Sequence, residues 1–364
     1  MTSAPRPWIA APACAIALAL SIAGCAGSGV RAETPPATWG TGMIKQAAVW
    51  YGTAEARRIA DTVIAYQSTE GGWPKNTDMT ALPGGPLDPE LANTFDNNGT
   101  TLPLAFLARV ISADGETPAR RAAFDRGLDY VLSAQYPNGG FPQFFPLRPG
   151  YYTHITYNDD AMVRILTLLN EIATSRSPYA FVDPARRARA TEAVSRGIDV
   201  IVKTQIVQDG KPTVWCAQHD EVTLAPAWAR RFEPPSLSGY ESVGITRFLM
   251  SIPNPSPEIV AAIEGAVGWF QAHGIADIAV ERFADPEGLA DRRVITAPGQ
   301  TLWARFYELD TNRPVFIGRD SVLHDALADI ERERRAGYNY YDGAAATLIG
   351  RDYPAWRMRL GRAG

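Results

Sequence analysis

The octapeptide Gln67-Ser-Thr-Glu-Gly-Gly-Trp-Pro74 returns along the chain as Gln135-Tyr-Pro-Asn-Gly-Gly-Phe-Pro142. A third copy, Gln205-Ile-Val-Gln-Asp-Gly-Lys-Pro212, keeps the glutamine, one glycine and the proline. A weaker fourth copy is Trp269-Phe-Gln271 with Gly274. The four glutamines are 68, 70 and 66 residues apart. A fixed period of this length predicts a lateral array of similar structural units.

Each glutamine ends a segment whose apolar residues recur at helical spacing and whose other face is rich in arginine; these segments are 55–67, 120–135, 186–205 and 258–271. The glycines and proline that follow predict a helix stop. A second helix that begins polar and turns apolar follows the first three loops, at 102–111, 161–172 and 242–250, and a final helix is expected at 320–335. The pattern predicts an all-α fold, an (α/α) toroid of repeated helix pairs whose inner helices begin on one face.

The N-terminal residues have the layout of an export signal. One positive residue, Arg6, precedes an apolar run that ends in Ile22-Ala-Gly-Cys25, which resembles the lipobox of bacterial lipoproteins. The run is shorter than a membrane span. We therefore expect a lipoprotein-type signal peptide at 1–24, a Gly-, Ser- and Pro-rich tether at 25–38 and one catalytic domain at 39–364. Ordinary signal cleavage, with Cys25 unmodified, is the alternative.

Composition narrows the class of partner and the cell compartment. The 364 residues are 46% hydrophobic and carry a formal net charge of −4, so the chain can bury a sizeable core but has no basic field that would attract nucleic acid. After Cys25 only Cys216 remains in the body of the chain, which allows no intrachain disulfide there. We expect an exported monomer, either secreted or anchored through a lipid at Cys25, that binds no nucleic acid.

Two predicted inner helices open with clusters of amide and acidic side chains. The first begins with Asn93-Thr-Phe-Asp96-Asn97-Asn98-Gly-Thr100, and the second with Thr156-Tyr-Asn158-Asp159-Asp160-Ala-Met162. Such residues cap helices, so pure capping is one explanation. Each cluster, however, has more oxygen atoms than a cap needs, and hard cations such as Ca²⁺ take several oxygen ligands. A metal or substrate site is the other explanation.

Arginines lie among aromatic residues farther along the chain, at Arg305 in Trp303–Glu308 and at Arg319 in Pro314–Asp320. A loop between two helices, 215–239, adds Arg230 and Arg231. A guanidinium pairs well with a carboxylate, so the alternatives are internal ion pairs and an anionic substrate. Several such arginines favour a polymer with regular carboxylates, as in a polyuronate. In the same loop His219 could bind a ligand or make a structural hydrogen bond.

The segments 71–76, 94–100, 139–145, 156–162, 215–242 and 303–319 resemble those of the family 10 pectate lyases, over nearly all of 39–345. The resemblance implies a toroidal fold and calcium-assisted β-elimination of polygalacturonate. It implies that Asp96 and Asp159 are the acidic pair that binds Ca²⁺, and that Arg305 and Arg319 bind substrate. The catalytic base would be the arginine three residues before a glutamate, here Arg230, although the adjacent Arg231 leaves the assignment open. We add Asn97 to the metal ligands, and Asn158 and His219 to the substrate-binding residues.

Three other functions remain open at this stage. The Gln-Trp pattern also occurs in triterpene cyclases, but those need an acid in an apolar aromatic cavity. A toroidal inverting glycosidase could use Asp96 and Asp159 as acid and base on a polyuronate. A lipoprotein that binds pectin without cleaving it would need only the arginines. An arginine base also requires an alkaline optimum, since free arginine keeps its proton far above neutral pH.

Overall fold

The computed structural model describes residues 38–362. The predicted signal peptide 1–24, Cys25 and the tether up to residue 37 lie outside the described residues, as do residues 363–364. Within 38–362, no helix has the length and apolar character needed to cross a bilayer.

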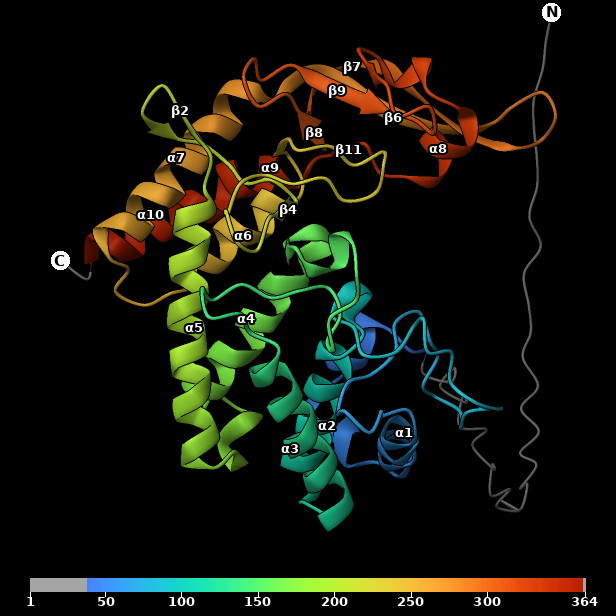
Figure 1. Ribbon diagram of the computed structural model, residues 1–364, viewed down its shortest axis with the longest axis vertical. Helices are drawn as coiled ribbons and strands as arrows, with labels where there is room; N and C mark the ends of the chain where they lie inside the picture. The colour runs from blue at the N-terminus through green and yellow to red at the C-terminus, as the bar shows by residue number, and fades with distance from the viewer. Residues whose placement is uncertain (1–37, 363–364) are drawn as a thin grey trace, which may run out of the picture. The chain divides into compact units, whose positions relative to one another are not determined.

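Two layers of helices confirm the predicted repeat (Figure 1). In the outer layer α1 contacts α3, α3 contacts α5 and α5 contacts α7; in the inner layer α2 contacts α4, and α4 contacts α6. The outer helices are α1 (Ala54–Ala65), α3 (Pro118–Ser133), α5 (Pro184–Thr204) and α7 (Pro257–His273), and the inner helices are α2 (Thr101–Asp114), α4 (Ala161–Ala173) and α6 (Glu241–Met250). Each outer helix begins at a side-chain cap, from Thr53, Thr117, Asp183 or Ser256, and the last three caps are followed by proline.

The repeated glutamines join each unit to the next. Gln67 Nε2 donates to the carbonyl of Gly71 in its own loop (2.9 Å) and to that of Ala123 in the next outer helix (2.8 Å). Gln135 makes the same pair of bonds to Gly139 and Ala193. Gln205 donates to Thr213 and Ala262, both at 2.8 Å. The sequence period is therefore a period of hydrogen bonds that fix neighbouring helix pairs side by side.

The repeated glycine lets the loop approach the next helix. Gly139 has φ of +99°, and a Cβ atom there would lie 2.0 Å from the carbonyl oxygen of Arg196. Any other residue would be strained in that backbone conformation and would also collide with α5. The glycine is thus required both by the turn and by the packing of consecutive units.

The repeated tryptophans show that the weak fourth copy begins three residues later than predicted. Trp73 and Trp215 donate their indole N–H to the carbonyls of Val63 and Ile201, each four residues before the repeat glutamine. Trp303 donates in the same way to Phe270 (2.9 Å), which puts Gly274 rather than Gln271 at the glutamine position. The third interval is then 69 residues, and the hairpin of residues 275–302 is inserted between the helix and its tryptophan.

The prediction of an all-α fold is wrong. Residues 38–362 are about 46% helix and 15% strand, and every strand among them pairs antiparallel. The long strands β6 (Ile275–Ala284) and β7 (Ala290–Ala304) form a hairpin with β11 (Tyr341–Asp342) beside β7, and a second sheet has the order β10-β9-β8-β5. The members of this second sheet are β5 (Leu237–Ser238), β8 (Phe306–Tyr307), β9 (Pro314–Ile317) and β10 (Leu323–His324). Two further pairs of short strands are β1 (Ile155–Thr156) with β4 (Gln218–His219), and β2 (Val207–Gln208) with β3 (Lys211–Pro212).

The predicted helix at 320–335 is also largely wrong. The carboxylate of Asp320 accepts from the backbone N–H of Val322 (3.1 Å) and contacts the ring of His324 (2.8 Å), and Ser321 has φ of +64°. These local bonds compete with helix formation, and the only helical elements in the range are the 3₁₀ turn η7 (Leu327–Asp329) and the start of the short helix α8 (Arg332–Gly337). A helix that the sequence pattern missed runs instead through α9 (Ala344–Thr347), the π-helical turn η8 (Leu348–Asp352) and α10 (Tyr353–Arg362).

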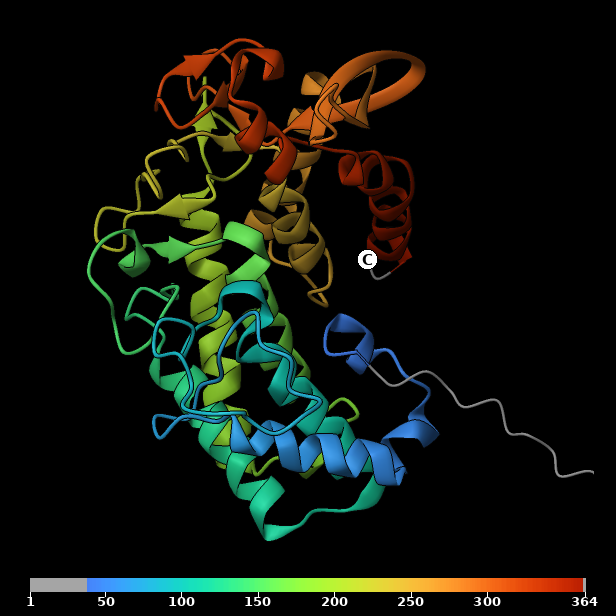
Figure 2. The same cartoon turned by 90° about the vertical axis from the view of Figure 1, so that its right-hand side faces the viewer.

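An N-terminal strap, residues 38–52, lies against α2 (blue in Figure 2). It contains the 3₁₀ turns η1 (Thr41–Ile44) and η2 (Ala48–Gly52). The rings of Trp39, Trp50 and Tyr51 surround Phe106 with centroid distances of 5.8, 6.3 and 6.4 Å. Edge-on aromatic packing of this kind fixes the strap on the inner helix.

Candidate active site

The two acid and amide clusters form matching turns at the starts of α2 and α4. They are the 3₁₀ turns η3 (Asp96–Asn98) and η5 (Asn158–Asp160), which contact each other. Asn97 and Asp159 take left-handed backbone angles, with φ of 47° and 50°. Asn and Asp tolerate this conformation better than other residues with a side chain. Neither helix has a side-chain cap hydrogen bond from its N-cap residue, Thr100 or Asp160. Pure capping therefore does not explain the clusters.

Each cluster is bound to a cation from another part of the chain. Asp96 Oδ2 lies 2.6 Å from Nζ of Lys75, and their side chains are 10% and 19% exposed. Asp159 Oδ1 lies 3.1 Å from Nη2 of Arg305, which also donates to Asn158 Oδ1 at 3.1 Å. The structure thus brings Asn158, Asp159 and Arg305 together, while Asp96 and Asn97 lie on the neighbouring turn.

Arg305 is a buried cation whose charge is met by two carboxylates. Its third partner is Oε1 of Glu241 at the start of α6, and the two side chains are 5% and 0% exposed. The Arg305 guanidinium also lies over the rings of Tyr240 (4.8 Å) and Tyr338 (4.6 Å). Burial alone would lower the pKa of Arg305, but the carboxylates of Glu241 and Asp159 outweigh it and raise the pKa well above its usual range. Arg305 stays charged.

A row of alternating guanidinium groups and rings extends from Arg305. Arg334 lies over Tyr338 at 3.7 Å and over Phe232 at 4.1 Å, and the guanidinium groups of Arg319 and Arg230 lie 4.7 and 5.1 Å from the Phe232 ring. Cations over aromatic faces are attracted by the ring quadrupole. We call this row the arginine ladder, and its members are Arg305, Tyr338, Arg334, Phe232, Arg319 and Arg230.

Arg334 is the ladder arginine that the sequence pattern missed, because it lies in a run of five charged residues that is typical of a solvated helix face. It is 6% exposed, and its Nη2 has no hydrogen-bond partner among residues 38–362. Its Nε donates to the hydroxyl of Tyr340 at 3.0 Å. A buried cation without a carboxylate partner is costly, so this position favours an anion from outside the protein.

Arg230 and Arg231 have different environments. Arg230 makes a bidentate pair with Glu233, with Nε to Oε2 at 2.8 Å and Nη2 to Oε1 at 2.5 Å, and its side chain is 43% exposed. Tyr338 donates its hydroxyl to the same carboxylate at 3.1 Å. Arg231 instead donates to the Ser321 hydroxyl at 2.8 Å. Of the two, only Arg230 belongs to the ladder.

Glu233 holds Arg230 in its charged form. The two hydrogen bonds and the negative charge of Glu233 raise the pKa of Arg230 well above its usual range. The same contact holds the pKa of Glu233 below its usual range, although burial acts in the opposite direction. Arg319 has a comparable but more exposed pair with Glu333, at 2.9 and 3.1 Å, and its side chain is 50% exposed.

His219 has a structural position. It is fully buried, its Nδ1 lies 2.9 Å from the carbonyl of Leu224, and its Nε2 accepts from the backbone N–H of Cys216 at 3.2 Å. Burial lowers the pKa of His219 to about 4, so the ring is neutral. Both ring nitrogens are therefore occupied within its own loop, and contact of His219 with substrate stays a prediction.

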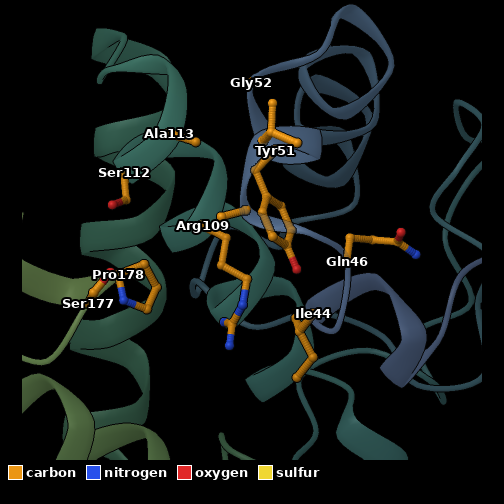
Figure 3. A pocket seen from close by; sticks show the side chains of 11 residues that line it. Ile44, Gln46, Tyr51, Gly52, Arg109, Ser112, Ala113, Ser177 and Pro178 are labelled. Atoms are coloured by element: carbon orange, nitrogen blue, oxygen red, sulfur yellow. The ribbon is translucent and has the colours of Figure 1, made fainter.

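Two other features lie apart from the ladder and the two turns. A cavity of about 680 Å³ lies near the end of α2. It is lined by Arg109, by Tyr51 and by other residues of the strap (Figure 3). Arg109 follows the turn at Asn98 by eleven residues, about 16 Å along the helix. His154, Asp220 and Glu221 place one ligand atom each within 4.8 Å of one another. However, Oδ1 of Asp220 already accepts hydrogen bonds from the backbone N–H groups of Val222 and Thr223. Neither feature joins the residues described above.

Comparison with known proteins identifies the family of this chain. Residues 67–349 match the family described as pectic acid lyase. A family 10 polysaccharide lyase from Cellvibrio cellulosa has a TM-score of 0.74 and 35% identity to this chain, over 83% of this chain and 93% of that one. An aspartate-to-alanine mutant of a family 10 polysaccharide lyase from the same organism, in complex with trigalacturonic acid, has the same score and identity and is covered over 94% of its length. No curated protein matches the chain. The resemblance found in the sequence is confirmed: this chain belongs to the pectic acid lyase family and is a polysaccharide lyase.

Proposed function

We propose that this lyase cleaves polygalacturonate by β-elimination, with Arg230 as the base and Ca²⁺ as the cofactor. The observation that most supports the proposal is the arginine ladder, in which four guanidinium groups line one row and Arg334 has no carboxylate partner among the described residues. Trigalacturonic acid, the ligand of the similar lyase, is a chain of carboxylates at regular intervals. A row of cations is the complement of such a chain.

The chemistry of elimination explains what the residues would have to do. The proton on C5 of the uronate lies next to the C6 carboxylate, and its removal pushes charge onto that carboxylate. Arginines bound there stabilise the developing charge. The bond from C4 to the leaving oxygen then breaks, a C4=C5 double bond forms, and the leaving oxygen takes a proton.

The residue types on the two turns suit a cation that binds oxygen ligands. The ion pairs that these residues already make limit how such a cation would bind. Asp96, Asn97 and Asp159 would hold Ca²⁺ through carboxylate and amide oxygens, the ligands that this ion takes. Lys75 and Arg305 already neutralise the two carboxylates, at 2.6 and 3.1 Å. A substrate carboxylate would supply the missing negative charge. When bound, the ion would withdraw charge from that carboxylate and so acidify C5.

The role of Arg230 as the base depends on its protonation state. Glu233 raises the pKa of Arg230, so the guanidinium can accept a proton only after it has lost one. That condition requires separation of the pair by substrate, alkaline solution, or both. We expect activity to rise with pH, because a larger fraction of Arg230 is then deprotonated.

A glycosidase mechanism at Asp96 and Asp159 is disfavoured by their partners. An inverting hydrolase needs one protonated carboxyl group as general acid. Both candidate acids are instead engaged in ion pairs, Asp96 with Lys75 and Asp159 with Arg305, so neither carboxyl group is left unpartnered for this role. Membership in the lyase family agrees with this argument.

The cellular setting also remains a proposal. We propose export of a monomer, with a lipid at Cys25 as the anchor or ordinary cleavage as its alternative. Labelling the chain in cells with a fatty-acid analogue and comparing it with a Cys25→Ala variant tests the anchor. Equal labelling of the wild-type chain and of Cys25→Ala would show that Cys25 carries no lipid anchor.

Ultraviolet absorbance tests the reaction directly. Polygalacturonate is incubated with the protein, first with added Ca²⁺ and then with a chelator. Elimination gives an unsaturated uronate that absorbs in the ultraviolet, and we expect absorbance to rise with Ca²⁺ and to stop rising with the chelator. New reducing ends without absorbance would indicate hydrolysis, and no product under either condition would indicate a binding protein.

A further inference from the structure

A second hollow lies beside the turn η3, which is part of the candidate site. Its volume is about 310 Å³, and it is bounded by the strap, by the segment after Trp73 and by the start of α2. The side chains that matter for its chemistry are those of Trp39, Asn76, Asp78, Asn97, Asn98 and Leu102. Asn97, which we assign to the cation, also donates its Nδ2 to Asn76 Oδ1 at 3.1 Å. The hollow therefore adjoins the proposed reaction site.

The strap forms one wall of this hollow and is fixed in place. Met43 is buried, and its carbonyl accepts from the hydroxyl of Tyr51 at 3.1 Å. Trp39 packs with its edge on Phe106, yet remains only half-buried, so part of its ring faces the hollow. The strap precedes residue 67, where the match to the lyase family begins. This wall is an addition to the matched segment.

The lining has the chemistry of a site for an uncharged sugar. A partly exposed indole ring offers a flat apolar face, and amides both donate and accept hydrogen bonds to hydroxyl groups. None of the described residues that line the hollow is Lys, Arg or His. Its one charged side chain, Asp78, has Oδ1 fixed by the amide and hydroxyl of Thr80, at 2.9 and 2.8 Å. A carboxylate here repels a uronate.

We propose that this hollow is a binding subsite for an uncharged sugar unit of the polysaccharide, a methyl-esterified galacturonate or a neutral sugar. The inference rests on the proposed function, because it takes the two turns to be the reaction site. The site then has two unlike ends. The arginine ladder selects carboxylates, and the hollow beside the strap accepts a unit that has none.

Two tryptophan variants test the subsite. Trp39→Ala removes the ring that faces the hollow. Trp50→Ala removes another strap ring that also packs on Phe106 but does not line the hollow. On partly methyl-esterified pectin we expect Trp39→Ala to lower kcat/KM by about threefold to tenfold, through KM, from the loss of one aromatic contact. On unesterified polygalacturonate the change should be under about twofold, and Trp50→Ala should leave the ratio between the two substrates unchanged. Equal losses on both substrates, or the same ratio change in both variants, would overturn the proposal.

A charge variant tests the discrimination separately and does not depend on strap packing. Asp78→Asn keeps an oxygen for the Thr80 hydrogen bonds and removes the charge. We expect it to raise kcat/KM on unesterified polymer relative to esterified polymer by about twofold to fivefold. An unchanged ratio would contradict the argument from charge.

Failure of the subsite can be told from failure of the proposed function. Calorimetry of a methyl-esterified hexagalacturonate with wild type and with Trp39→Ala measures binding without turnover. Weaker binding by Trp39→Ala supports the subsite even if the enzyme proves inactive on polygalacturonate, which would overturn only the reaction. Equal binding by both proteins overturns the subsite whatever the activity.

Discussion

The helical repeat, residues 54–273, and the β-rich region, residues 275–342, are built in different ways and supply different parts of the site. The repeat is held by periodic glutamine bonds, and its inner helices begin at the acid and amide turns. This β-rich region begins with the inserted hairpin, residues 275–302, and the residues after the hairpin provide Arg305, Arg319, Arg334 and Tyr338. The periodic part thus positions oxygen ligands, and the segment after the inserted hairpin adds cations.

The two regions also have separate hydrophobic cores. One hydrophobic cluster spans the helices, while a second cluster contains Phe232, Phe306, Val315, Phe316, Ile317, Leu327, Ile330 and Tyr340. Two members of the second cluster, Phe232 and Tyr340, also contact Arg334. The small core therefore serves as the support of the arginine ladder, and changes there should affect activity more than changes in the repeat.

Among the changes that test the comparison of the two regions, the largest effect is expected at Arg305, which joins them through Asp159 and Glu241. Arg305→Ala should lower kcat on the order of a hundredfold or more, because a donor to the reacting carboxylate is lost. It should also destabilise the fold by about 3–5 kcal/mol, because Glu241 is left buried without its partner. Turnover at low temperature and urea unfolding measure the two effects.

Arg313→Ala is the matched control for Arg305. Arg313 lies in the same region, and its pair with Glu308 at 2.6 Å is 46% and 25% exposed. An exposed pair contributes at most about 1 kcal/mol. A loss of activity or stability at Arg313 equal to that at Arg305 would mean that any arginine in this region matters and that the ladder is not special.

The repeat should respond in the opposite way, with stability lost and chemistry kept. Gln135→Leu leaves the carbonyls of Gly139 and Ala193 without their donor. We expect the free energy of unfolding to fall by about 1–3 kcal/mol, with kcat of the folded enzyme unchanged. Gln46→Leu removes a single exposed bond and serves as control. A drop in kcat without a drop in stability would break the proposed division between the regions.

Acid should weaken the fold through His219. Burial lowers its folded pKa from 6.5 to about 4, so the unfolded chain binds a proton that the folded chain does not between these two values. This contribution to stability is complete above pH 6.5 and is lost as the pH falls toward 4, by up to about 3 kcal/mol. Unfolding curves of wild type and His219→Gln, measured from pH 7 to 4, should show a smaller pH dependence in the variant. Parallel curves would show that another group is responsible.

The smallest expected effect is a shift of the pH profile. Glu233 raises the pKa of Arg230, so Glu233→Gln should lower it, and activity should then develop about one to three pH units lower. Glu333→Gln, which removes the comparable partner of Arg319, should not shift the profile. Identical shifts in both variants, or none in either, would contradict the link between Glu233 and the base.

The difference between the regions also explains what could be predicted from the sequence. The periodic glutamines, with the glycines and prolines that follow them, predicted the helix pairs and the convergence of the turns at Asp96 and Asp159, because each repeat obeys the same local rules. The hairpin was missed although Ile278, Val280 and Val294 lie on facing strands and a turn with Gly288 at φ +80° joins them. Alternation of this kind predicts strands, but the helical period was continued through it.

Contacts between distant segments could not be predicted in the same way. Glu241 precedes an apolar helix like an ordinary first-turn acid, and nothing local indicates its pairing with Arg305, 64 residues away. Tyr338 and Arg334 lie in a charged stretch whose burial depends on Phe232, a residue more than 100 positions earlier. The choice between Arg230 and Arg231 likewise required the positions of Glu233 and Ser321.

The central claim, that Arg230 at the end of the ladder is the base, is tested most directly by paired variants of the two neighbouring arginines. Arg230→Ala and Arg231→Ala are compared by ultraviolet absorbance on polygalacturonate, at saturating Ca²⁺ and high pH. We expect Arg230→Ala to lower turnover about 10²- to 10⁴-fold, the range for loss of a general base, and Arg231→Ala to remain near wild type. Unchanged turnover in Arg230→Ala would contradict the account.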